Sequence, residues 1–370
     1  MDKLTKAREI IDRVDREMAA LFCERMKAAA LVAEHKKEKG MPIFDAAREK
    51  AVIEKNASRV EEPALREFYT LFLQHTMDVS KLYQRKLLSG MRIAYAGTEG
   101  AFAHVAAMRI FPDGEKVPFV DFAAAYSSVE SGDCDAAVIP IENSYAGEVA
   151  EAVDLIYFGS LRINGVYELP VVHDLLALPG AAMADIKTVI SHPQALSQCA
   201  HYINEAGFAV KEFSNTALAA KHVAEAGDKS LAAIAGGETG ELYGLCSLAK
   251  GINASRSNTT RFAVLSRAEN DPLQGGRGDH FILLLTVKHA AGSLVRAIDI
   301  LGKYGYNITT LRSRPVKELL WQYYFYVEAE GDIHSHEGRQ MLEEMSLCCD
   351  GIKPAGSFVC GHHGEAGDGK

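Results

Sequence analysis

The residues with the clearest chemical content are cations on an apolar face of one long predicted helix. Apolar side chains recur at alternating spacings of three and four along residues 4–35, which is a heptad-like seam. Arg25 occupies one position of this seam, and arginine is rarely buried without an anionic partner. Lys36 lies about three helical turns further on, so it returns to the same face. The two cations predict a site for a small anion, although a solvated helix surface would also carry charges.

Further polar residues share faces of the helices that follow. Glycine and proline punctuation predicts helices over about residues 2–39, 44–60 and 64–88. Asp45 and Arg48 are three positions apart and share a face, and Glu49 follows Arg48 in the sequence. Ser80 and Gln84 are four positions apart and also share a face. Arg8 lies roughly 100° around the axis from Arg25, so we expect it to point toward a neighbouring helix or subunit. The first helix would span roughly 55 Å, more than a small domain is wide, and it therefore predicts a helical dimer.

From residue 91 onward, short strands alternate with helices, and polar side chains follow the strands. Repeated βα units predict parallel sheets, whose ligands lie beyond the carboxyl ends of the strands. Residues 91–268 are long enough for two such lobes with a cleft between them, and a helix is expected from about Gly147. The polar residues expected at strand ends are Glu142, Asn143, Ser144, His192 and Gln194. The sequence NTTRF then places Thr260, Arg261 and Phe262 at the start of a strand, where a phenylalanine is more often core than ligand contact.

The remaining residues predict a third domain. Residues 269–277 are polar and glycine-rich, as in a linker. Residues 278–361 read as strand, helix, strand, strand, helix and a short last strand near residues 356–360. The predicted architecture is therefore an all-α segment (1–89), a two-lobed α/β segment (91–268) and an α+β domain of βαββαβ order (278–361).

The composition excludes several classes of protein. Of the 370 residues, 48% are hydrophobic and 24% are charged, which excludes a disordered or fibrous chain. The net charge of −9 argues against general nucleic-acid binding. No run reaches the ~18 apolar residues of a membrane helix, and the first residues are too charged for a signal peptide. Seven cysteines without a CxxC pair fit a reducing compartment, so we expect a cytoplasmic protein.

Cysteine and histidine residues gather near the end of the chain. They are Cys348, Cys349, Cys360, His362 and His363. Their spacing fits no familiar zinc pattern, and adjacent cysteines are awkward ligands for one ion. We therefore expect neither a metal nor another cofactor.

The helical segment resembles the all-helical chorismate mutases that form intertwined dimers. The resemblance covers residues 4–86 and is carried by AREIIDRVD, LFCERMKAA, HKKEKGMPIFDAAREK and DVSKLYQ. It implies a site built from Arg8 of the partner subunit and from Arg25, Lys36, Asp45, Arg48, Glu49, Ser80 and Gln84. The rearrangement of chorismate to prephenate is pericyclic, so the site needs no nucleophile. It must hold a flexible dicarboxylate in its compact conformer and stabilise charge on the breaking ether oxygen.

The roles of these residues follow from the resemblance. Arginines clamp the two carboxylates, since a guanidinium matches a carboxylate bidentately. Lys36 and Gln84 donate to the ether oxygen, with Glu49 as a protonated or bridging partner.

Four motifs of the middle segment, in their order, resemble the prephenate dehydratases. They are GTEGAFAH at 97–104, VIPIENSYAGEV at 138–149, SHPQALSQC at 191–199 and NTTRF at 258–262. The resemblance implies a two-lobed fold of the type II periplasmic-binding-protein kind. It also implies loss of carbon dioxide and hydroxide from prephenate, which gives phenylpyruvate. Thr260 is the expected donor to the leaving hydroxyl, and Arg261 with helix-start amides is expected to anchor the retained carboxylate.

Some residues of the middle segment depart from the family pattern. Ala101, Ala103 and Ala146 stand where the family carries hydroxyl side chains. Tyr145 also replaces one such residue, and its phenol is a hypothetical substitute for a lost hydroxyl. The choice between prephenate and its amino analogue arogenate therefore stays open.

The last domain resembles the amino-acid-sensing ACT domain. The resemblance rests on the turn Gly292-Ser293-Leu294-Val295 and on the Ser-Arg-Pro motif at 313–315. It implies that L-phenylalanine binds at an interface between paired domains, at Gly292, Ser293, Leu294, Val295, Asn307, Ser313, Arg314 and Pro315. Arg312 stands where the family has glutamate, so inhibition by phenylalanine stays open. A module that only dimerises is the alternative.

Together these resemblances predict a bifunctional enzyme of phenylalanine biosynthesis that is a homodimer or a higher oligomer. Its expected substrates are chorismate and prephenate, with phenylalanine as effector. Two alternatives remain. In one, the middle segment binds an aromatic acid without turning it over and serves regulation. In the other, an active mutase is fused to a degenerate dehydratase.

Overall fold

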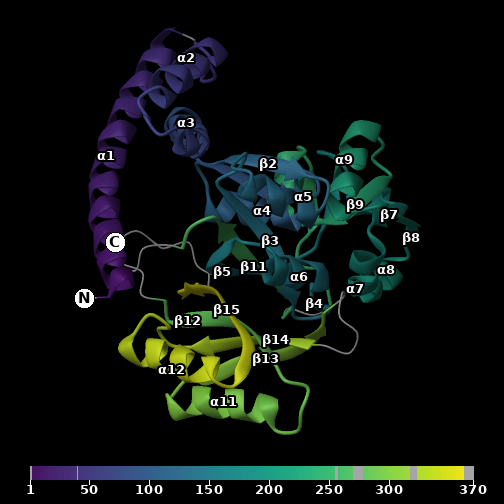
Figure 1. Ribbon diagram of the computed structural model, residues 1–370. Coiled ribbons are helices and arrows are strands. Elements are labelled where there is room, and N and C mark those ends of the chain that lie inside the picture. The colour runs from purple at the N-terminus through teal and green to yellow at the C-terminus, as the bar shows by residue number, and fades with distance from the viewer. Residues whose placement is uncertain (1, 40, 255–256, 270–277, 317–322, 362–370) are drawn as a thin grey trace, which may run out of the picture. The chain divides into compact units, whose positions relative to one another are not determined.

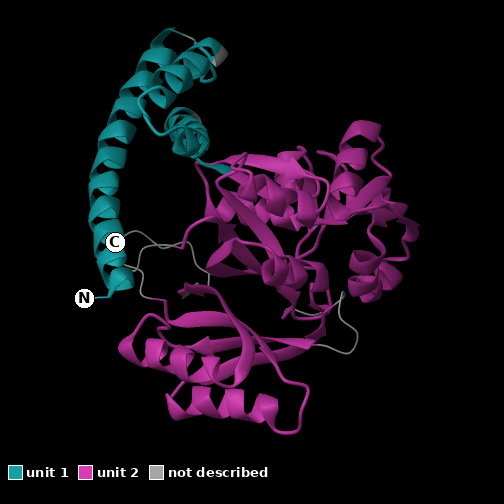
Figure 2. Cartoon of the chain, viewed as in Figure 1, with its two compact units in different colours: residues 1–92 teal, residues 93–370 magenta. Residues whose placement is uncertain are grey.

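The computed structural model describes residues 2–39, 41–254, 257–269, 278–316 and 323–361. The chain divides into two compact units, residues 1–92 and residues 93–370, which Figure 2 colours separately. His362 and His363 lie outside the described residues.

No group of three or more His, Cys, Asp or Glu side chains in the described ranges is arranged to hold a metal ion. No described helix combines the length and apolar character needed to cross a membrane.

The first unit consists of the three predicted helices, α1 (Lys3–Lys39), α2 (Ala46–Ala57) and α3 (Pro63–Ser89). Helix α2 begins at its N-cap Asp45, whose carboxylate accepts a hydrogen bond from the backbone N–H of Arg48 at 3.0 Å. Helix α3 begins at Pro63, a residue that suits a first helical turn because it lacks an N–H.

The packing of α1 departs from the predicted seam. Its buried residues are Met26, Ala29 and Ala33, whereas Leu21 is 64% exposed. Most of the apolar seam therefore has no partner within one chain.

A seven-stranded sheet forms the first lobe of the second unit. Its order is β16-β5-β11-β3-β1-β2, with β4 paired to β3. The strands are β1 (Arg92–Ala96), β2 (Glu115–Phe119), β3 (Ala136–Asn143), β4 (Gly147–Glu148), β5 (Arg162–Pro170), β11 (Thr259–Ser266) and β16 (Cys360–Gly361). The helices are α4 (Phe102–Ile110), α5 (Phe122–Glu130) and α6 (Ala150–Phe158).

One expectation for this lobe was wrong. The sheet is mixed rather than parallel, because β11 returns late in the chain and runs antiparallel to both β3 and β5. The helix expected from about Gly147 begins three residues later, at Ala150. Gly147 itself begins the short strand β4, with φ at 84°, a left-handed conformation that favours glycine. The strand ends expected to carry ligands are nevertheless adjacent, because Thr260 of β11 pairs with Asn143 of β3.

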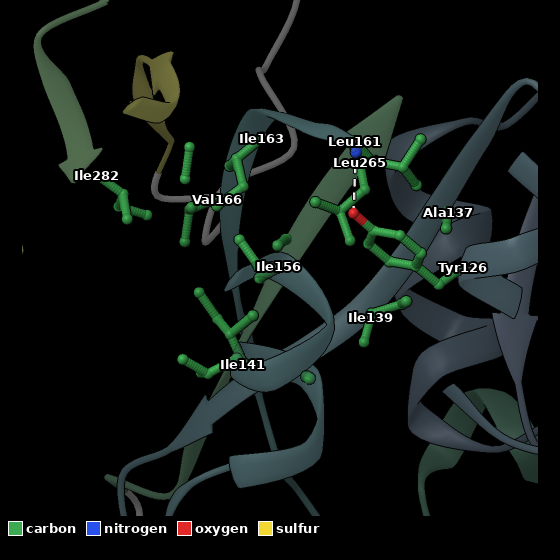
Figure 3. Packing of buried hydrophobic residues seen from close by; sticks show 14 of the residues in the cluster. Tyr126, Ala137, Ile139, Ile141, Ile156, Leu161, Ile163, Val166, Leu265 and Ile282 are labelled. Carbon is green, nitrogen blue, oxygen red and sulfur yellow. Dashed lines mark hydrogen bonds between the residues drawn. The ribbon is translucent and has the colours of Figure 1, made fainter. Parts of the chain in front are cut away.

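The core of this lobe lies between the sheet and its helices (Figure 3). Ile139 and Ile141 of β3 pack with Ile156 of α6 and with Tyr126 of α5. The hydroxyl of the buried Tyr126 accepts a hydrogen bond from the backbone N–H of Leu161 at 2.9 Å. This pairing satisfies a polar group in an apolar surrounding, which would otherwise be costly to bury.

A five-stranded sheet forms the second lobe, in the order β10-β6-β9-β7-β8. The strands are β6 (Asp174–Ala177), β7 (Thr188–Ser191), β8 (Ala209–Glu212), β9 (Leu231–Ala235) and β10 (Cys246–Ala249). The helices are α7 (Pro193–Gln198), α8 (Ala200–Ala206), α9 (Thr216–Ala226) and α10 (Gly237–Leu242), with a 3-10 turn at Met183–Asp185. Strands β8 and β9 run parallel to β7, as expected for βα units. The sheet as a whole is mixed rather than parallel, because β6 runs antiparallel to both β9 and β10.

The last domain confirms the predicted βαββαβ order. Its elements are β12 (His280–Val287), α11 (Ser293–Lys303), β13 (Asn307–Pro315), β14 (Tyr323–Glu330), α12 (His336–Ser346) and β15 (Cys349–Phe358), and the sheet order is β13-β14-β12-β15. Alternate residues of β12 face opposite sides. Leu283 packs toward α11 and α12, whereas Ile282 and Leu284 join the core of the first lobe. The sheet therefore lies between its own helices and the first lobe (Figure 1).

Candidate active sites

A cavity of about 320 Å³ lies among the three helices of the first unit. Seven of the eight residues implied for the helical site line it, namely Arg25, Lys36, Asp45, Arg48, Glu49, Ser80 and Gln84. Arg8 does not line this cavity within one chain. The fold therefore brings together side chains of three separate helices that the resemblance implied as one site.

The guanidinium of Arg25 is held in place by hydrogen bonds to helix α3. Its guanidinium donates hydrogen bonds to the hydroxyl of Ser80 and, at 3.3 Å, to the backbone carbonyl of Thr76. Burial lowers the pKa of Arg25 from its ordinary value, because a charged group is poorly solvated there. An anionic ligand would compensate this cost.

The sequence analysis missed one residue of this cavity, Lys81. Its ammonium group forms ion pairs with Glu49 at 3.0 Å and with Asp78 at 2.9 Å. Burial alone would lower the pKa of Lys81, but hydrogen bonds to Asp78 and Glu49 raise it above its ordinary value. Lys81 directly follows Ser80 in α3. Its pairing with Glu49 depends on the packing of α2 against α3, which the sequence pattern does not show.

Gln84 carries an unused polar atom into this site. Its side chain is buried, and its amide oxygen has no hydrogen-bond partner among the residues that the structure describes. A buried polar atom without a partner is unfavourable unless a ligand supplies one. The oxygen and nitrogen of a glutamine amide can exchange places by rotation, so Gln84 can offer a donor or an acceptor to a ligand.

The charge of this cavity suits a dianion. Its lining includes four cationic side chains, Arg25, Lys36, Arg48 and Lys81, against two carboxylates, Asp45 and Glu49. The surplus is two positive charges, which matches a dicarboxylate.

A second cavity, of about 340 Å³, lies between the two lobes of the second unit. The first lobe contributes Asn143, Val149 and Thr260, among others, and the second contributes His192 and Gln194. No lysine, arginine, aspartate or glutamate is among the described residues that line it. The site therefore works with amides, hydroxyls and imidazoles rather than with formal charges.

Asn143 organises the first-lobe side of this cavity. Its amide nitrogen donates to the hydroxyl oxygen of Thr260 and to the amide oxygen of Asn258, both at 2.9 Å. Its amide oxygen accepts from the backbone N–H groups of Tyr145 and Ala146, at 3.0 and 2.8 Å. Since Thr260 accepts from Asn143, its own hydroxyl proton is free to be donated to a ligand.

The sequence analysis missed His173 and Gln198, which meet in this cavity. The ring Nε2 of His173 and the amide oxygen of Gln198 are 2.9 Å apart, so Nε2 carries the proton. The Nδ1 atom is buried and has no hydrogen-bond partner in the part of the chain that the structure describes. Burial lowers the pKa of His173, although Gln198 and Asp174 oppose the shift, and the ring is neutral near pH 7.

Simple signals could have found these residues. Gln198 lies one helical turn after Gln194, on the same face. Asn215 begins α9 as an N-cap, accepting a hydrogen bond from the backbone N–H of Leu218, and it also lines the cavity. No local pattern singles out His173, because its partner comes from a different element.

Four residues implied for the second site do not line its cavity. They are Glu142, Ser144, Arg261 and Phe262. Phe262 is a core residue, 1% exposed. The hydroxyl of Ser144 donates a hydrogen bond to the backbone carbonyl of Ser257 at 2.8 Å, which links the end of β3 to the segment before β11. Tyr145 is 71% exposed and also lies outside the cavity lining, so the structure does not support it as a substitute hydroxyl.

Arg261 faces away from the cavity because successive side chains of a strand point to opposite faces. Thr260 points into the cavity, whereas the guanidinium of Arg261 forms ion pairs with Glu142 at 3.2 Å and with Glu328 at 2.5 Å. Its charge is therefore already compensated, and it is not placed to anchor a carboxylate in this cavity.

A third cavity, of about 560 Å³, lies beside the last domain. Of the residues implied for the effector, only Leu294 lines it, together with Tyr157, Phe325 and others. Gly292 has a φ of 81°, which favours glycine at the start of α11, and Val295 is 67% exposed. Asn307 donates to Glu330 at 3.0 Å, and Arg314 donates to Glu148 and Asp154. Of the remaining three, Ser293 is buried, whereas Ser313 and Pro315 are exposed.

Comparison with known proteins identifies the relatives of this chain. The family described as chorismate mutase type II matches residues 7–85, and the family described as prephenate dehydratase matches residues 93–270. The bifunctional chorismate mutase/prephenate dehydratase of Escherichia coli (strain K12) is 30% identical, over 96% of each chain. The corresponding protein of Aquifex aeolicus is 28% identical, over 97% of this chain and 98% of its own.

Two solved structures resemble the second unit. A prephenate dehydratase from Arthrobacter aurescens, in complex with L-Phe, is 27% identical over 72% of this chain and 89% of its own, with a TM-score of 0.65. A chain described as a novel type of quorum quenching acylase is 30% identical over 73% of this chain and 98% of its own, with a TM-score of 0.67. One fold thus carries different described activities, and the reaction must be argued from the site.

Proposed function

This chain belongs to the bifunctional chorismate mutase/prephenate dehydratase family, and from that premise we propose that it catalyses two consecutive steps of phenylalanine biosynthesis. The first unit rearranges chorismate to prephenate. The second unit converts prephenate to phenylpyruvate. The observation that carries the first activity is the cavity with a surplus of two positive charges, and the second rests on the free hydroxyl proton of Thr260.

In the mutase site, binding and charge stabilisation do the work. One carbon–oxygen bond of chorismate breaks while one carbon–carbon bond forms, and no atom leaves. Arg25 and Arg48 clamp the two carboxylates and hold the ends of the molecule close together. Lys36 and Gln84 donate to the ether oxygen as negative charge develops there. Lys81 holds Glu49 in place, since the two form an ion pair at 3.0 Å.

We propose that the mutase site is completed in a homodimer by Arg8 of the partner subunit. The support is the apolar seam of α1, where Leu4, Ile11 and Leu21 are 55%, 56% and 64% exposed in one chain. A helix with such a seam is stable when a second helix covers it. Arg8 lies on this same helix and is itself exposed.

In the dehydratase site, Thr260 donates its proton to the leaving hydroxyl, and its alkoxide then takes a proton back from solvent water. The electron pair of the carbon–carboxyl bond moves into the ring, carbon dioxide leaves, and the hydroxide departs as water with the donated proton. The ring becomes aromatic, and no oxidant or reductant is consumed. Apolar side chains at Val149, Val171 and Ala195 suit the carboxylate that is lost, because a charge is poorly solvated there.

The retained carboxylate is held by neutral donors. Arg261 is occupied by Glu142 and Glu328, so it does not serve. Helix α4 begins at the cavity with Phe102, and its N-cap Ala101 provides no side-chain hydrogen bond to the first turn. Backbone N–H groups at such a helix start attract carboxylates. His192, Gln194 and Asn143 complete the site.

We propose that the last domain is an ACT domain that binds phenylalanine. Its βαββαβ order and the left-handed Gly292 at the start of α11 support this assignment. A relative of 27% identity was solved with L-Phe bound. We also place both reactions in the cytoplasm, where thiols stay reduced, since Cys23, Cys134, Cys199, Cys246, Cys348 and Cys349 are free.

One experiment tests the two activities. Purified protein is supplied first with chorismate and then with prephenate, and prephenate and phenylpyruvate are followed with and without phenylalanine. We expect both products from chorismate and phenylpyruvate from prephenate. Prephenate that accumulates without further conversion would instead show an active mutase fused to a non-catalytic binding module.

A further inference from the structure

Three arginines and five carboxylates meet where the last domain packs on the first lobe. The arginines are Arg261 of β11 and Arg312 and Arg314 of β13. The carboxylates are Glu142, Glu148, Asp154 and Glu168 of the first lobe and Glu328 of β14. This ion-pair cluster lies outside the lining of the dehydratase cavity, and the reaction as described above does not use it.

One ion pair of the cluster joins Glu328 to Arg261. The two guanidinium nitrogens donate to the two carboxylate oxygens at 2.5 and 3.0 Å, a bidentate arrangement. The side chain of Glu328 is only 3% exposed, and Tyr326 donates to it at 3.3 Å. A carboxylate so deeply buried is stable only while its cationic partner stays in place.

Arg312 compensates a repulsion within the first lobe. Glu142 and Glu148 are directly opposite each other on β3 and β4, where like charges are destabilising. Arg312 donates to Glu142, and its other terminal nitrogen lies 3.7 Å from Glu148. Glutamate at this position, as in the motif that the domain resembles, would place a third carboxylate beside these two.

The residues that the cluster holds are the sequence neighbours of the residues that line the cavity. Arg261 follows Thr260, and Glu142 precedes Asn143. The two pairs lie in register on adjacent strands, with Arg261 opposite Glu142 and Thr260 opposite Asn143. Each cavity residue thus sits on one face of the sheet while its neighbour is anchored on the other.

From these contacts we propose that Glu328 and Arg312 of the last domain are positioning residues of the dehydratase site. They fix the ends of β3, β4 and β11 so that Asn143 keeps Thr260 in its donating orientation. The last domain is then a structural component of the active site as well as a place for an effector. The expected effect on kcat rests on the dehydratase activity proposed above. The expected anchoring of β3, β4 and β11 does not depend on that activity.

The first test compares Glu328→Gln with Glu344→Gln. Glu344 carries a surface ion pair with Lys303 in the same domain, at 2.6 Å, so it controls for the loss of a charge there. We expect Glu328→Gln to lower the dehydratase kcat about tenfold, since misplaced groups lose rate, while KM changes less than about twofold. Glu344→Gln should behave as the parent. The mutase activity of the same chain normalises the enzyme concentration.

The second test uses Arg312, whose side chain is 27% exposed and therefore less critical for folding. We expect kcat to be highest for Arg312→Lys, lower for Arg312→Gln and lowest for Arg312→Glu, because lysine keeps the charge whereas glutamate adds a third carboxylate. Arg339→Gln is the matched control, since the side chain of Arg339 donates to the carbonyl of His334 on the domain surface.

Amide hydrogen exchange of residues 140–149 gives a readout that does not depend on turnover. We expect faster exchange in Glu328→Gln and Arg312→Glu than in the parent and the controls. If the parent itself does not convert prephenate, the proposed function fails, and the exchange still tests the anchoring. Parental kcat in a folded Arg312→Glu variant overturns the positioning role, whether or not exchange has changed. If Glu328→Gln does not fold, the Arg312 series decides alone.

Discussion

Replacement of Arg25 by alanine tests the mutase site most directly. The change removes one of the two positive charges by which the cavity exceeds neutrality and deletes a group placed to clamp a carboxylate. Each hydrogen bond to a charged group contributes about 1.5–3 kcal/mol, so the loss of a bidentate pair costs roughly 3–6 kcal/mol. At about 1.4 kcal/mol per tenfold change, kcat/KM should fall roughly 10²–10⁴-fold.

The fold should tolerate this change. Among the residues that the structure describes, Arg25 donates to the hydroxyl of Ser80 and to the carbonyl of Thr76, and burial already disfavours its charge. We therefore expect a change in unfolding free energy within about 1 kcal/mol. Arg25→Lys should recover part of the activity, because lysine keeps the charge but not the bidentate geometry.

The assay follows chorismate consumption, with circular dichroism at 222 nm as the measure of helix content. Arg13→Ala is the control, since Arg13 forms an exposed ion pair with Glu17 on the same helix. Dehydratase activity of the same sample should equal that of the parent. Undiminished chorismate turnover by a fully helical Arg25→Ala protein would refute the assignment of this cavity.

Three further predictions concern the other sites. Thr260→Val should lower the dehydratase kcat roughly 10²–10³-fold, and Thr260→Ser should restore much of it, because only the hydroxyl donates the proton; initial rates of phenylpyruvate formation decide. Burial lowers the pKa of His173 below its ordinary value of 6.5, so the unfolded chain takes up this proton first as the pH falls. The stability that the neutral His173 ring contributes is therefore fully present above about pH 6.5 and is lost as the pH falls below that value. The urea midpoints at pH 7.5 and pH 5.5 should differ less in His173→Asn than in the parent. Leu21→Glu on the exposed seam should yield monomers with little mutase activity, as measured by light scattering and chorismate turnover; a monomeric parent would contradict the dimer.

Local sequence patterns determined most of the helical unit. The punctuation by Gly40, Pro42, Pro63 and Gly90 separates three helices, and the boundaries differ from prediction by at most three residues. Helical spacing also placed Arg25 with Lys36, Asp45 with Arg48 and Ser80 with Gln84 on shared faces, and all six line the cavity. Side chains a whole number of turns apart share a face whatever the tertiary structure. The same local logic predicted the order of elements in the last domain.

Only the tertiary structure decided which polar side chains meet. Strand β11 returns antiparallel between β3 and β5, and no periodicity encodes these pairings between residues 89 to 130 positions apart. That pairing sets Thr260 beside Asn143 and turns Arg261 away from the cavity toward Glu328. His173 and Gln198 likewise meet only through the fold. Sequence spacing fixes the face of an element on which a side chain lies, but the partner across that face depends on long-range packing.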